Sequence, residues 1–351
     1  MATFPTTSAA LTTEWLSGAL GTRVTGFEIE PIGVGVGLVC DLVRVHLRHD
    51  GEGPATLIAK FPSASAENRF VALVLNMYGR ETRFYRELAK DTPLSAPRCH
   101  AVERDVEADE FVLLLEDLAG TRVVDQIVGI GRADAELAID QLAILHAKWW
   151  NHPALDSVPR LCDSPYPEAV GAAFVGAWGP IQEVCAGLVT PNVQALGDRF
   201  ADLIPGLMAR LSEPPWTLSH GDYRLDNMFF SDDPTRPLVL VDWQLYDRSR
   251  GPRDLSYLLS QSMEPALRAE CERALVERYV AGLVAGGVAD YDVDQAWSDY
   301  RLATLFDFVY PVIAGGGLTL ANERAVELAR TIFARFVAAF EHLDCASLAQ
   351  V

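Results

Sequence analysis

The sequence predicts an α+β fold of two lobes, a β-rich N-terminal lobe over residues 1–117 and a mainly helical C-terminal lobe over residues 118–351. Its 351 residues exceed the usual length of one domain and suit two. Half of the residues are hydrophobic, which is enough to bury a sizeable core. Side chains alternate with a period of two in much of the first part, whereas helical periodicity dominates the second.

The N-terminal lobe is predicted to contain one short helix, a group of strands and one longer helix. Residues 9–20 have the pattern of a short amphipathic helix. Residues 28–49 predict two strands around a glycine-rich turn, because apolar and polar side chains alternate through the second half. Residues 56–61 predict a third strand, and residues 67–90 a helix. Residues 111–118 predict an apolar strand that stops at an acidic pair.

The C-terminal lobe is predicted to be helical around one small hairpin. Residues 134–150 have a clear helical pattern, and helical segments dominate 168–212 and 264–345. Between them, residues 228–230 and 238–244 predict the two strands of a hairpin, because a turn-forming stretch of Ser, Asp and Pro separates them.

The composition excludes several classes of protein. A net charge of −19 without a Lys/Arg-rich run argues against binding to nucleic acid. The six cysteines include no C-x-x-C pair, so they are expected to be reduced thiols of a cytoplasmic protein. The N-terminus lacks the pattern of a signal peptide, and the longest apolar run, 279–289, is too short to span a bilayer.

Three glycines form the first candidate site, in the sequence GVGVG (Gly33, Gly35 and Gly37). A glycine-rich loop lets backbone N–H groups approach phosphates closely. The following residues alternate as a strand, whereas a dinucleotide-binding loop would open into a helix. A glycine-rich turn between two strands is what kinases place over the phosphates of ATP, although an ordinary hairpin turn has the same pattern.

Lys60 is the second candidate, because it interrupts an apolar strand and needs a partner or solvent there. Glu81 lies on the apolar face of the helix that follows, whereas Glu87 lies off that face. Kinases pair a strand lysine with a helix glutamate to hold the lysine on the α- and β-phosphates. Taken singly, each residue also fits an ordinary surface charge.

The third candidate is HGDYRLDN, in which Asp222 and Asn227 have the D-x-x-x-x-N spacing of a kinase catalytic loop. Phosphoryl transfer needs a carboxylate that accepts the proton of the acceptor hydroxyl, and oxygen ligands for Mg²⁺. Asp242 follows fifteen residues after Asn227, at the end of an apolar strand, and supplies a second ligand. Asp226 is expected at the surface, and His220 is expected to be a buried loop residue.

These motifs resemble those of the aminoglycoside phosphotransferase superfamily, especially its choline-kinase-like and ecdysteroid-kinase-like branch. The resemblance is carried by GVGVG, AK at 59–60, GRETRFYREL, LLLEDL, HGDYRLDN, VDWQ and GPRDLSYLL, which occur in the family's order along most of the chain. It implies a protein-kinase-like bilobal fold that uses ATP and Mg²⁺ to phosphorylate a hydroxyl group of a small molecule.

The resemblance also implies a role for each matching residue. Asp222 would be the catalytic base, and Asn227 and Asp242 the metal ligands. Lys60 and Glu81 would position the phosphates of the nucleotide. The segment from Glu116 to Leu118 would be the hinge whose backbone meets adenine, and Asp254 would hold the catalytic loop.

Two departures from protein kinases favour a small-molecule acceptor. Gly221 replaces the arginine of H-R-D, and Asp242-Trp243-Gln244 replaces D-F-G. Only eleven residues separate Asp242 from Asp254, which leaves no room for a long peptide-binding segment. A non-catalytic nucleotide-binding regulator and an aminoglycoside-type antibiotic kinase remain as alternatives. A nucleotide-dependent oxidoreductase is disfavoured by the strand after Gly37.

The acceptor itself is left open by the sequence, as are the choice between ATP and GTP and the oligomeric state. Its pocket is expected in the second lobe, near Tyr223, Asp247 and residues 305–317. That last segment is apolar and aromatic, with Phe306, Phe308 and Tyr310 as possible lining residues and Asp307 as its one charge. A neutral or apolar alcohol is therefore expected rather than an aminoglycoside.

Overall fold

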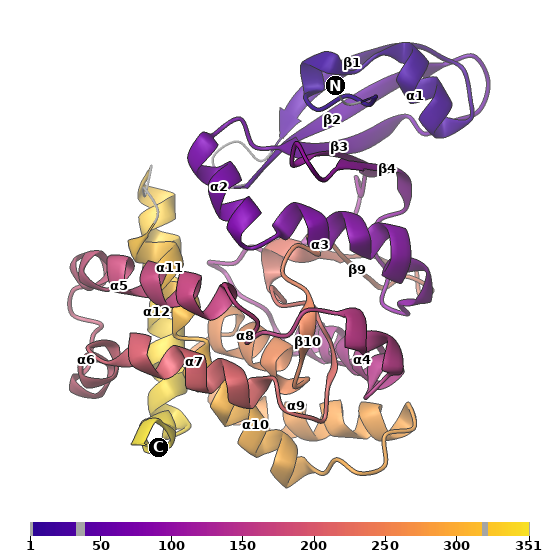
Figure 1. Ribbon diagram of the computed structural model, residues 1–351. Helices are drawn as coiled ribbons and strands as arrows, with labels where there is room; N and C mark the ends of the chain where they lie inside the picture. Colours follow the sequence, from indigo (N-terminus) through magenta and orange to yellow (C-terminus); the bar gives the residue numbers. More distant parts are fainter. Residues whose placement is uncertain (1–2, 33–38, 318–321, 351) are drawn as a thin grey trace. The chain divides into compact units, whose positions relative to one another are not determined.

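A computed structural model describes residues 3–32, 39–317 and 322–350 (Figure 1). The chain forms two compact units. Unit 1 comprises Met1–Thr121 and Leu240–Leu245, and unit 2 comprises Arg122–Val239 and Tyr246–Val351. Asp242 therefore belongs to unit 1, whereas Asp222 and Asn227 belong to unit 2.

Unit 1 contains an antiparallel five-stranded sheet in the order β1-β2-β3-β5-β4. Its strands are β1 (Val24–Ile32), β2 (Cys40–His49), β3 (Thr56–Pro62), β4 (Cys99–Asp105) and β5 (Glu110–Glu116). Lys60 of the central strand β3 lies opposite Leu42 on one side and Leu113 on the other. The three strands predicted within 28–61 and the strand predicted at 111–118 are present.

Helix α1 (Thr13–Leu20) packs on this sheet. It follows a short 3-10 turn at Ser8–Ala10 and begins after Thr12, whose side chain accepts a hydrogen bond from the Trp15 N–H. Its buried Leu16 joins Val45, Ala59 and other apolar residues of the strands in one core.

The helix predicted at 67–90 is instead broken into several pieces. Helix α2 (Ala66–Val74) and helix α3 (Met77–Arg83) are separated at Asn76, which has a φ of 51°. A left-handed residue cannot continue a right-handed helix, and Asn is one of the few residue types that tolerate this conformation. A π-helical turn at Phe84–Leu88 and a 3-10 turn at Ala89–Asp91 complete the segment.

The segment Leu240–Leu245 packs within unit 1 although it lies far along the chain. The Trp243 indole is fully buried and stacks on the Phe84 ring, with centroids 3.8 Å apart and an interplanar angle of 6°. Its Nε1 donates a hydrogen bond to the Leu240 carbonyl, and the Leu240 N–H donates one to the Ser95 carbonyl. These contacts fix the backbone on both sides of Asp242.

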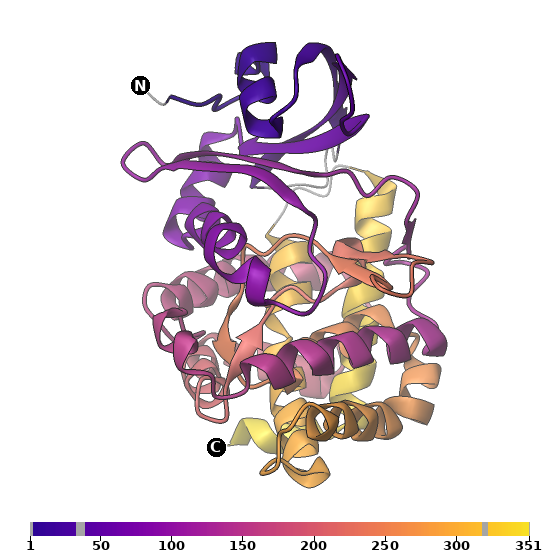
Figure 2. The ribbon, with the colours of Figure 1, turned by 90° about the vertical axis from the view of Figure 1, so that its right-hand side faces the viewer.

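Unit 2 is mainly helical. Its helices are α4 (Arg132–Trp149), α5 (Tyr166–Val184), α6 (Pro191–Gly197), α7 (Phe200–Leu211), α8 (Pro252–Ser262), α9 (Pro265–Ala285), α10 (Val293–Phe306), α11 (Val309–Gly316) and α12 (Glu323–His342). Short 3-10 turns lie at Pro153–Ser157, Leu225–Asn227 and Cys345–Gln350. Helix α4 packs along α9, as Figure 2 shows in magenta and orange. Every residue of α8 is buried, so this helix forms the centre of the unit.

Five short strands frame the catalytic-loop sequence. Strands β7 (Thr217–Ser219) and β10 (Asp247–Ser249) form an antiparallel pair. Strands β6 (Arg122–Val123), β8 (Met228–Phe230) and β9 (Leu238–Leu240) form a second small sheet. The predicted hairpin is confirmed, because β8 and β9 are neighbours and the Ser231 N–H donates to the Pro237 carbonyl. Asn227 directly precedes β8, and Asp242 follows two residues after β9.

Residues 305–317 do not supply the open apolar surface that the sequence suggested. Phe308 is fully buried and contacts a cluster of aromatic rings, which are Phe174, Trp178, Phe200, Phe333 and Phe336. Phe306 is also buried, whereas Tyr310 is half-buried. Of the two interpretations of these phenylalanines, core or pocket lining, the structure therefore supports core, since both belong to the packing that holds α10 and α11.

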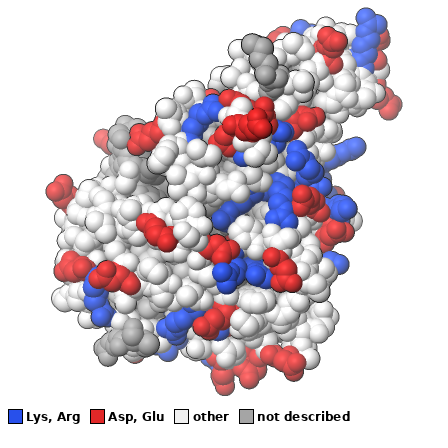
Figure 3. All heavy atoms as spheres, in the orientation of Figure 1, with Lys and Arg blue, Asp and Glu red and all other residues white. Residues whose placement is uncertain are grey.

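The surface carries both signs of charge. On the face shown in Figure 3, acidic and basic side chains lie interspersed among uncharged ones. All six cysteines are free, as predicted. Among the described residues, no helix has both the length and the apolar character needed to cross a membrane.

Candidate active site

Lys60 and Glu81 form a buried ion pair within unit 1. Lys60 Nζ lies 2.7 Å from Glu81 Oε2 and 2.9 Å from Oε1. Only 5% of Lys60 and 1% of Glu81 is exposed. Strand β3 and helix α3 hold the two residues, so the pair that the sequence predicted at a separation of 21 residues is present.

Burial shifts the pKa values of Lys60 and Glu81 in opposite directions. It opposes the charge on Lys60, but the carboxylates of Asp242 and Glu81 outweigh it and raise the pKa of the lysine well above its usual value. Burial raises the pKa of Glu81 to about 7, with Lys60 acting against that rise. Lys60 is therefore held as a cation, and Glu81 changes charge near neutral pH.

Asp242 completes this cluster. Its Oδ1 lies 3.0 Å from Lys60 Nζ, and the Gln244 side-chain amide donates to the same oxygen. The residue adopts a φ of 65°, and about a third of its side chain is exposed. Such a left-handed backbone is unusual for a residue other than glycine and often accompanies functional sites. The contacts of Trp243 hold the strained turn that aims this carboxylate at Lys60.

Asp222 and Asn227 form the corresponding pair in unit 2. The Asn227 side-chain amide donates to the Asp222 carbonyl and to Asp222 Oδ2, at 2.9 Å each. A 3-10 turn over Leu225–Asn227 brings the two residues together. The Asn227 nitrogen is therefore committed to Asp222, which orients its amide oxygen as the ligand atom.

Asp254 holds the backbone of this loop. Its carboxylate accepts hydrogen bonds from the backbone N–H groups of His220 (2.7 Å) and Gly221 (2.9 Å) and from the Ser219 hydroxyl (2.8 Å). Gly221 has a φ of 82°, a conformation that favours glycine and explains why the arginine of H-R-D is replaced at this position. The geometry agrees with the loop-holding role that the resemblance implied for Asp254.

The pKa of Asp254 is low despite its burial. Burial alone would raise it, but the hydrogen bond and positive charge of His146, followed by the charge of Arg253, outweigh burial and lower the pKa to about 2. His146 Nε2 lies 3.3 Å from Asp254 Oδ2, and its Nδ1 lies 2.8 Å from the Tyr279 hydroxyl. Sequence reasoning missed His146 and Tyr279, which lie on separate helices and share no motif with the loop.

Arg224 is a third residue that sequence reasoning missed. Its Nε lies 3.2 Å from Asp222 Oδ1, and its Nη1 lies 2.9 Å from Asp226 Oδ2. The sequence feature that could have identified it is its position between the two aspartates of HGDYRLDN. Asp226, predicted as a surface residue, is about a third exposed and takes part in this ion pair.

Three further residues of unit 2 that the sequence singled out are all buried. His220 is fully buried, as expected, and its Nδ1 lies 3.3 Å from the Asp222 N–H. Tyr223 is also fully buried and donates to the Ala138 carbonyl. Asp247 is 1% exposed and bound to Arg253 at 2.8 Å. Both residues are thus buried, and the expectation that the acceptor pocket lies near them stays a prediction.

The predicted nucleotide-facing segments are described only in part. Gly33, Gly35 and Gly37 lie outside the described residues. At the hinge, the Glu116 carboxylate accepts the Arg98 N–H at 3.0 Å. The Leu118 carbonyl accepts both the N–H and the hydroxyl of Thr121, so it is used within the turn.

The donors in both units suit Mg²⁺ chemically. Asp242 offers a carboxylate and Asn227 an amide oxygen, and Mg²⁺ prefers such hard oxygen ligands together with phosphates and water. The orientation of the Asn227 amide, whose nitrogen is bound to Asp222, leaves oxygen as its metal-binding atom. Each of the two residues is therefore a candidate ligand by its own donor chemistry.

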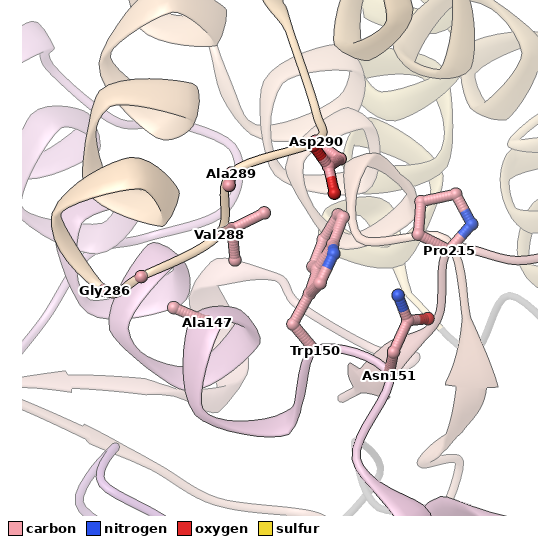
Figure 4. A pocket seen from close by; sticks show the side chains of 9 residues that line it. Ala147, Trp150, Asn151, Pro215, Gly286, Val288, Ala289 and Asp290 are labelled. Atoms are coloured by element: carbon pink, nitrogen blue, oxygen red, sulfur yellow. The ribbon is translucent and has the colours of Figure 1, made fainter.

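A cavity of about 370 Å³ lies elsewhere in unit 2. It is lined by the C-terminal end of α4, Pro215 and residues 286–290, with Trp150 extending toward Asp290 (Figure 4). None of the described residues predicted for the active site lines this cavity. The cavity is therefore not part of the candidate active site.

Comparison with known proteins agrees with the motifs. The model of the ecdysteroid kinase-like family matches residues 178–287. Comparison of the sequence with curated proteins found no significant match.

Three solved structures show the same fold. A Ralstonia eutropha JMP134 protein, provisionally described as an aminoglycoside phosphotransferase, has a TM-score of 0.56 and 15% identity over 95% of this chain and 97% of its own. A microcompartment-associated aminopropanol kinase has a TM-score of 0.53 and 17% identity over 92% and 94%. Plasmodium vivax ethanolamine kinase has a TM-score of 0.51 and 13% identity over 90% and 81%. These likenesses confirm the predicted protein-kinase-like α+β fold and the resemblance to small-molecule phosphotransferases that the motifs indicated.

Proposed function

We propose that this protein uses ATP and Mg²⁺ to transfer the γ-phosphate to a hydroxyl group of a small molecule. The observation that carries the proposal is a pair of preformed clusters. One is the ion-paired Lys60, Glu81 and Asp242 of unit 1, and the other is the bonded Asp222 and Asn227 of unit 2. Phosphoryl transfer depends mainly on positioning and on charge stabilisation, which these groups are arranged to supply.

The unit 1 cluster would bind the nucleotide. Lys60 presents a buried cation for the α- and β-phosphates, and Glu81 keeps it in place. Gly33, Gly35 and Gly37 would cover the phosphates, and the backbone from Glu116 to Leu118 would meet adenine. Because the Leu118 carbonyl already binds Thr121, other backbone groups of that segment would carry the adenine contacts.

The unit 2 cluster would act on the acceptor. Asp222 accepts the proton of the acceptor hydroxyl while that oxygen forms its bond to phosphorus and ADP leaves. Asn227 fixes the orientation of the Asp222 carboxylate through its amide nitrogen. When bound, Mg²⁺ supplies positive charge against the transferring phosphate.

The acceptor is proposed to be a neutral or apolar alcohol. Polycations require uncompensated acidic groups near the reacting centre. In this loop Arg224 binds both Asp222 and Asp226, so a single arginine partly offsets the charge of the two carboxylates. An aminoglycoside-type activity is therefore the less favoured candidate.

The test is a panel of acceptors assayed for consumption of ATP with Mg²⁺. We expect turnover with hydrophobic hydroxyl compounds at low and high salt, and little with kanamycin-like polycations. Efficient, salt-sensitive phosphorylation of the polycations would reverse the choice of acceptor. Tight, Mg²⁺-dependent binding of nucleotide without transfer to any compound would instead favour the alternative of a non-catalytic regulator.

A further inference from the structure

The turn that carries Asn227 is held by a side chain from a distant part of unit 2. Gln126 lies in the segment between β6 and α4, and only 2% of it is exposed. Its Oε1 accepts a hydrogen bond from the backbone N–H of Leu225 at 3.2 Å. Leu225 is the first residue of the 3-10 turn Leu225–Asn227 and is fully buried. The first N–H groups of a helical turn have no partner within that turn, so Gln126 supplies the partner that this buried group needs.

The same amide group is bound on its other side to the end of helix α8. Gln126 Nε2 donates to the Gln261 carbonyl and to the Ser262 hydroxyl, at 3.1 Å each. A backbone carbonyl can only accept and a backbone N–H can only donate, so the partners fix which amide atom is oxygen and which is nitrogen. The side chain of Gln126 therefore links the loop of Asp222 to α8 in one orientation.

The backbone of Gln126 is anchored as well. Arg335, on helix α12, donates from Nη1 to the carbonyls of Gln126 (2.6 Å) and Gln261 (3.2 Å). Its Nη2 donates to the Ile127 carbonyl at 2.8 Å. A side chain that packing and hydrogen bonds lock in place holds its partner more precisely than a free one does. Gln126 is thus fixed to two helices of unit 2, which makes it a rigid support for the turn.

Gln126 and Asp254 hold the loop on both sides of the proposed base. Asp254 binds two backbone N–H groups that come just before Asp222. Gln126 binds the N–H of Leu225, which lies between Asp222 and Asn227. The hydrogen bonds from the Asn227 amide to Asp222 depend on this turn, so a shift at Leu225 would move the amide away from the carboxylate.

We propose that Gln126 is a positioning residue, which fixes the turn Leu225–Asn227 so that Asn227 orients Asp222 and presents its amide oxygen to Mg²⁺. This inference rests on the proposed function, in which Asn227 is a metal ligand and Asp222 the base. Gln126 acts through Asn227 and takes no part in the transfer of the proton. Replacing a residue that holds a metal ligand in place typically lowers metal affinity or activity by on the order of 10–100-fold.

The test variant is Gln126→Met, which keeps the unbranched shape of the side chain and removes both of its hydrogen-bonding groups. Gln126→Asn keeps the amide but is a methylene shorter, so it cannot reach both partners, and it serves where Gln126→Met does not fold. Gln182→Met is the matched control, because the Gln182 amide likewise donates to a backbone carbonyl of unit 2, that of Trp178, at 3.2 Å.

Amide hydrogen exchange of residues 222–228 is compared first, in the absence of any ligand. We expect faster exchange in both Gln126 variants and wild-type exchange in Gln182→Met, because exchange reports local opening of the loop. Calorimetric titration with an ATP analogue then gives the Mg²⁺ concentration needed for half-maximal binding. That concentration should rise about tenfold in Gln126→Met and stay unchanged in Gln182→Met.

Turnover of ATP with the best compound of the panel is measured in the same variants at saturating Mg²⁺. We expect Gln126→Met to lower kcat about tenfold, since a small displacement of a reacting group costs rate. In the Asn227→Ala background the same substitution should add little to the loss, because it acts through Asn227.

Two results would overturn the inference about Gln126. One is a pair of Gln126 variants that have a lower Tm but keep the wild-type kcat and Mg²⁺ dependence, which would make the residue merely structural. The other is an equal loss with and without Asn227. Neither touches the proposed function, provided that Asn227→Ala itself weakens Mg²⁺-dependent binding. Wild-type behaviour of Asn227→Ala would instead count against the proposed function.

Discussion

Asp222 is surrounded by donors, and this defines what a substitution there should do. Asn227 and Arg224 bind its two oxygens from within the loop. A carboxylate so engaged is held in one orientation, and phosphoryl transfer depends mainly on positioning. We therefore expect Asp222→Asn, which is nearly isosteric, to fold normally.

The first prediction concerns the rate in that variant. Asp222→Asn should lower kcat by on the order of 10²–10⁴-fold with little change in KM for ATP, because general-base removal typically has that cost. Steady-state kinetics with an acceptor from the panel measures it. Near wild-type turnover would show that Asp222 is not the base.

The second prediction separates the two proposed metal ligands. Asp242→Ala should weaken Mg²⁺-dependent binding of an ATP analogue more than Asn227→Ala does, since only the carboxylate adds charge to the site. Calorimetric titration with and without Mg²⁺ distinguishes them, and Asp226→Ala serves as a control within the same loop. Equal losses, or binding that ignores Mg²⁺, would contradict the assignment.

At the scale of elements, hydrophobic periodicity predicted most strands of unit 1. It missed elements whose residues are all buried or mostly half-buried. Strand β4 was missed because it is the edge strand of the sheet and most of its residues are only partly buried. Helix α8 was missed because polar residues make up much of its sequence, although all of its residues are buried. The break at Asn76 was missed because its cause is a left-handed backbone conformation, which the spacing of apolar residues does not reveal.

The third prediction uses the pairing between β3 and α3. Because the pKa of Glu81 is about 7, Glu81 is largely protonated at pH 6 and ionised at pH 8. Protonation removes the charge that holds Lys60, so wild-type affinity for an ATP analogue with Mg²⁺ should fall as the pH is lowered from 8 to 6. Glu81→Gln should bind about tenfold more weakly at pH 8.

The comparison of pH profiles is the decisive measurement for that pair. Glu81→Gln carries no charge that titrates, so its affinity should vary less with pH than that of the wild type. Glu87→Gln is the control, since that exposed residue pairs with Arg83 and not with Lys60. Parallel profiles for the wild type and Glu81→Gln would refute the role of this ion pair.

At the scale of the whole molecule, the sequence predicted which motif residues lie together and missed the side chains that support them. Spacing within one segment linked Asp222 to Asn227, and the apolar surroundings of Lys60 pointed to a charged partner. His146 lies on a helix distant in sequence from the loop and acts on it through Asp254, whose carboxylate it contacts. Such contacts depend on tertiary packing, which no local pattern encodes.

The fourth prediction concerns stability and a carboxylate outside the proposed site. Asp307 is fully buried and accepts hydrogen bonds from Ser256 and Ser260, and burial raises its pKa to about 8. Between the ordinary pKa of aspartate and pH 8, the folded protein therefore binds a proton that the unfolded chain has released. The free energy of unfolding must then decrease as the pH rises through that window.

Asp307→Asn removes this proton linkage while keeping the size of the side chain. Urea unfolding at pH 5 and pH 8 should show a smaller loss of stability with pH than in the wild type, by on the order of 2 kcal/mol. The exposed Asp290→Asn should leave the wild-type difference unchanged. Equal differences in Asp307→Asn and the wild type would mean that Asp307 is ionised in the folded protein throughout.

The placement of Leu240–Leu245 in unit 1 limits how this chain can be cut into fragments. A fragment ending at Thr121 would lose the Trp243 indole that covers the Phe84 ring, and Lys60 would keep Glu81 but lose Asp242. The complementary fragment would carry an indole with no ring to stack on. Separately produced halves should therefore be poorly soluble alone and recover together when mixed, because six residues of the second half complete the fold of the first.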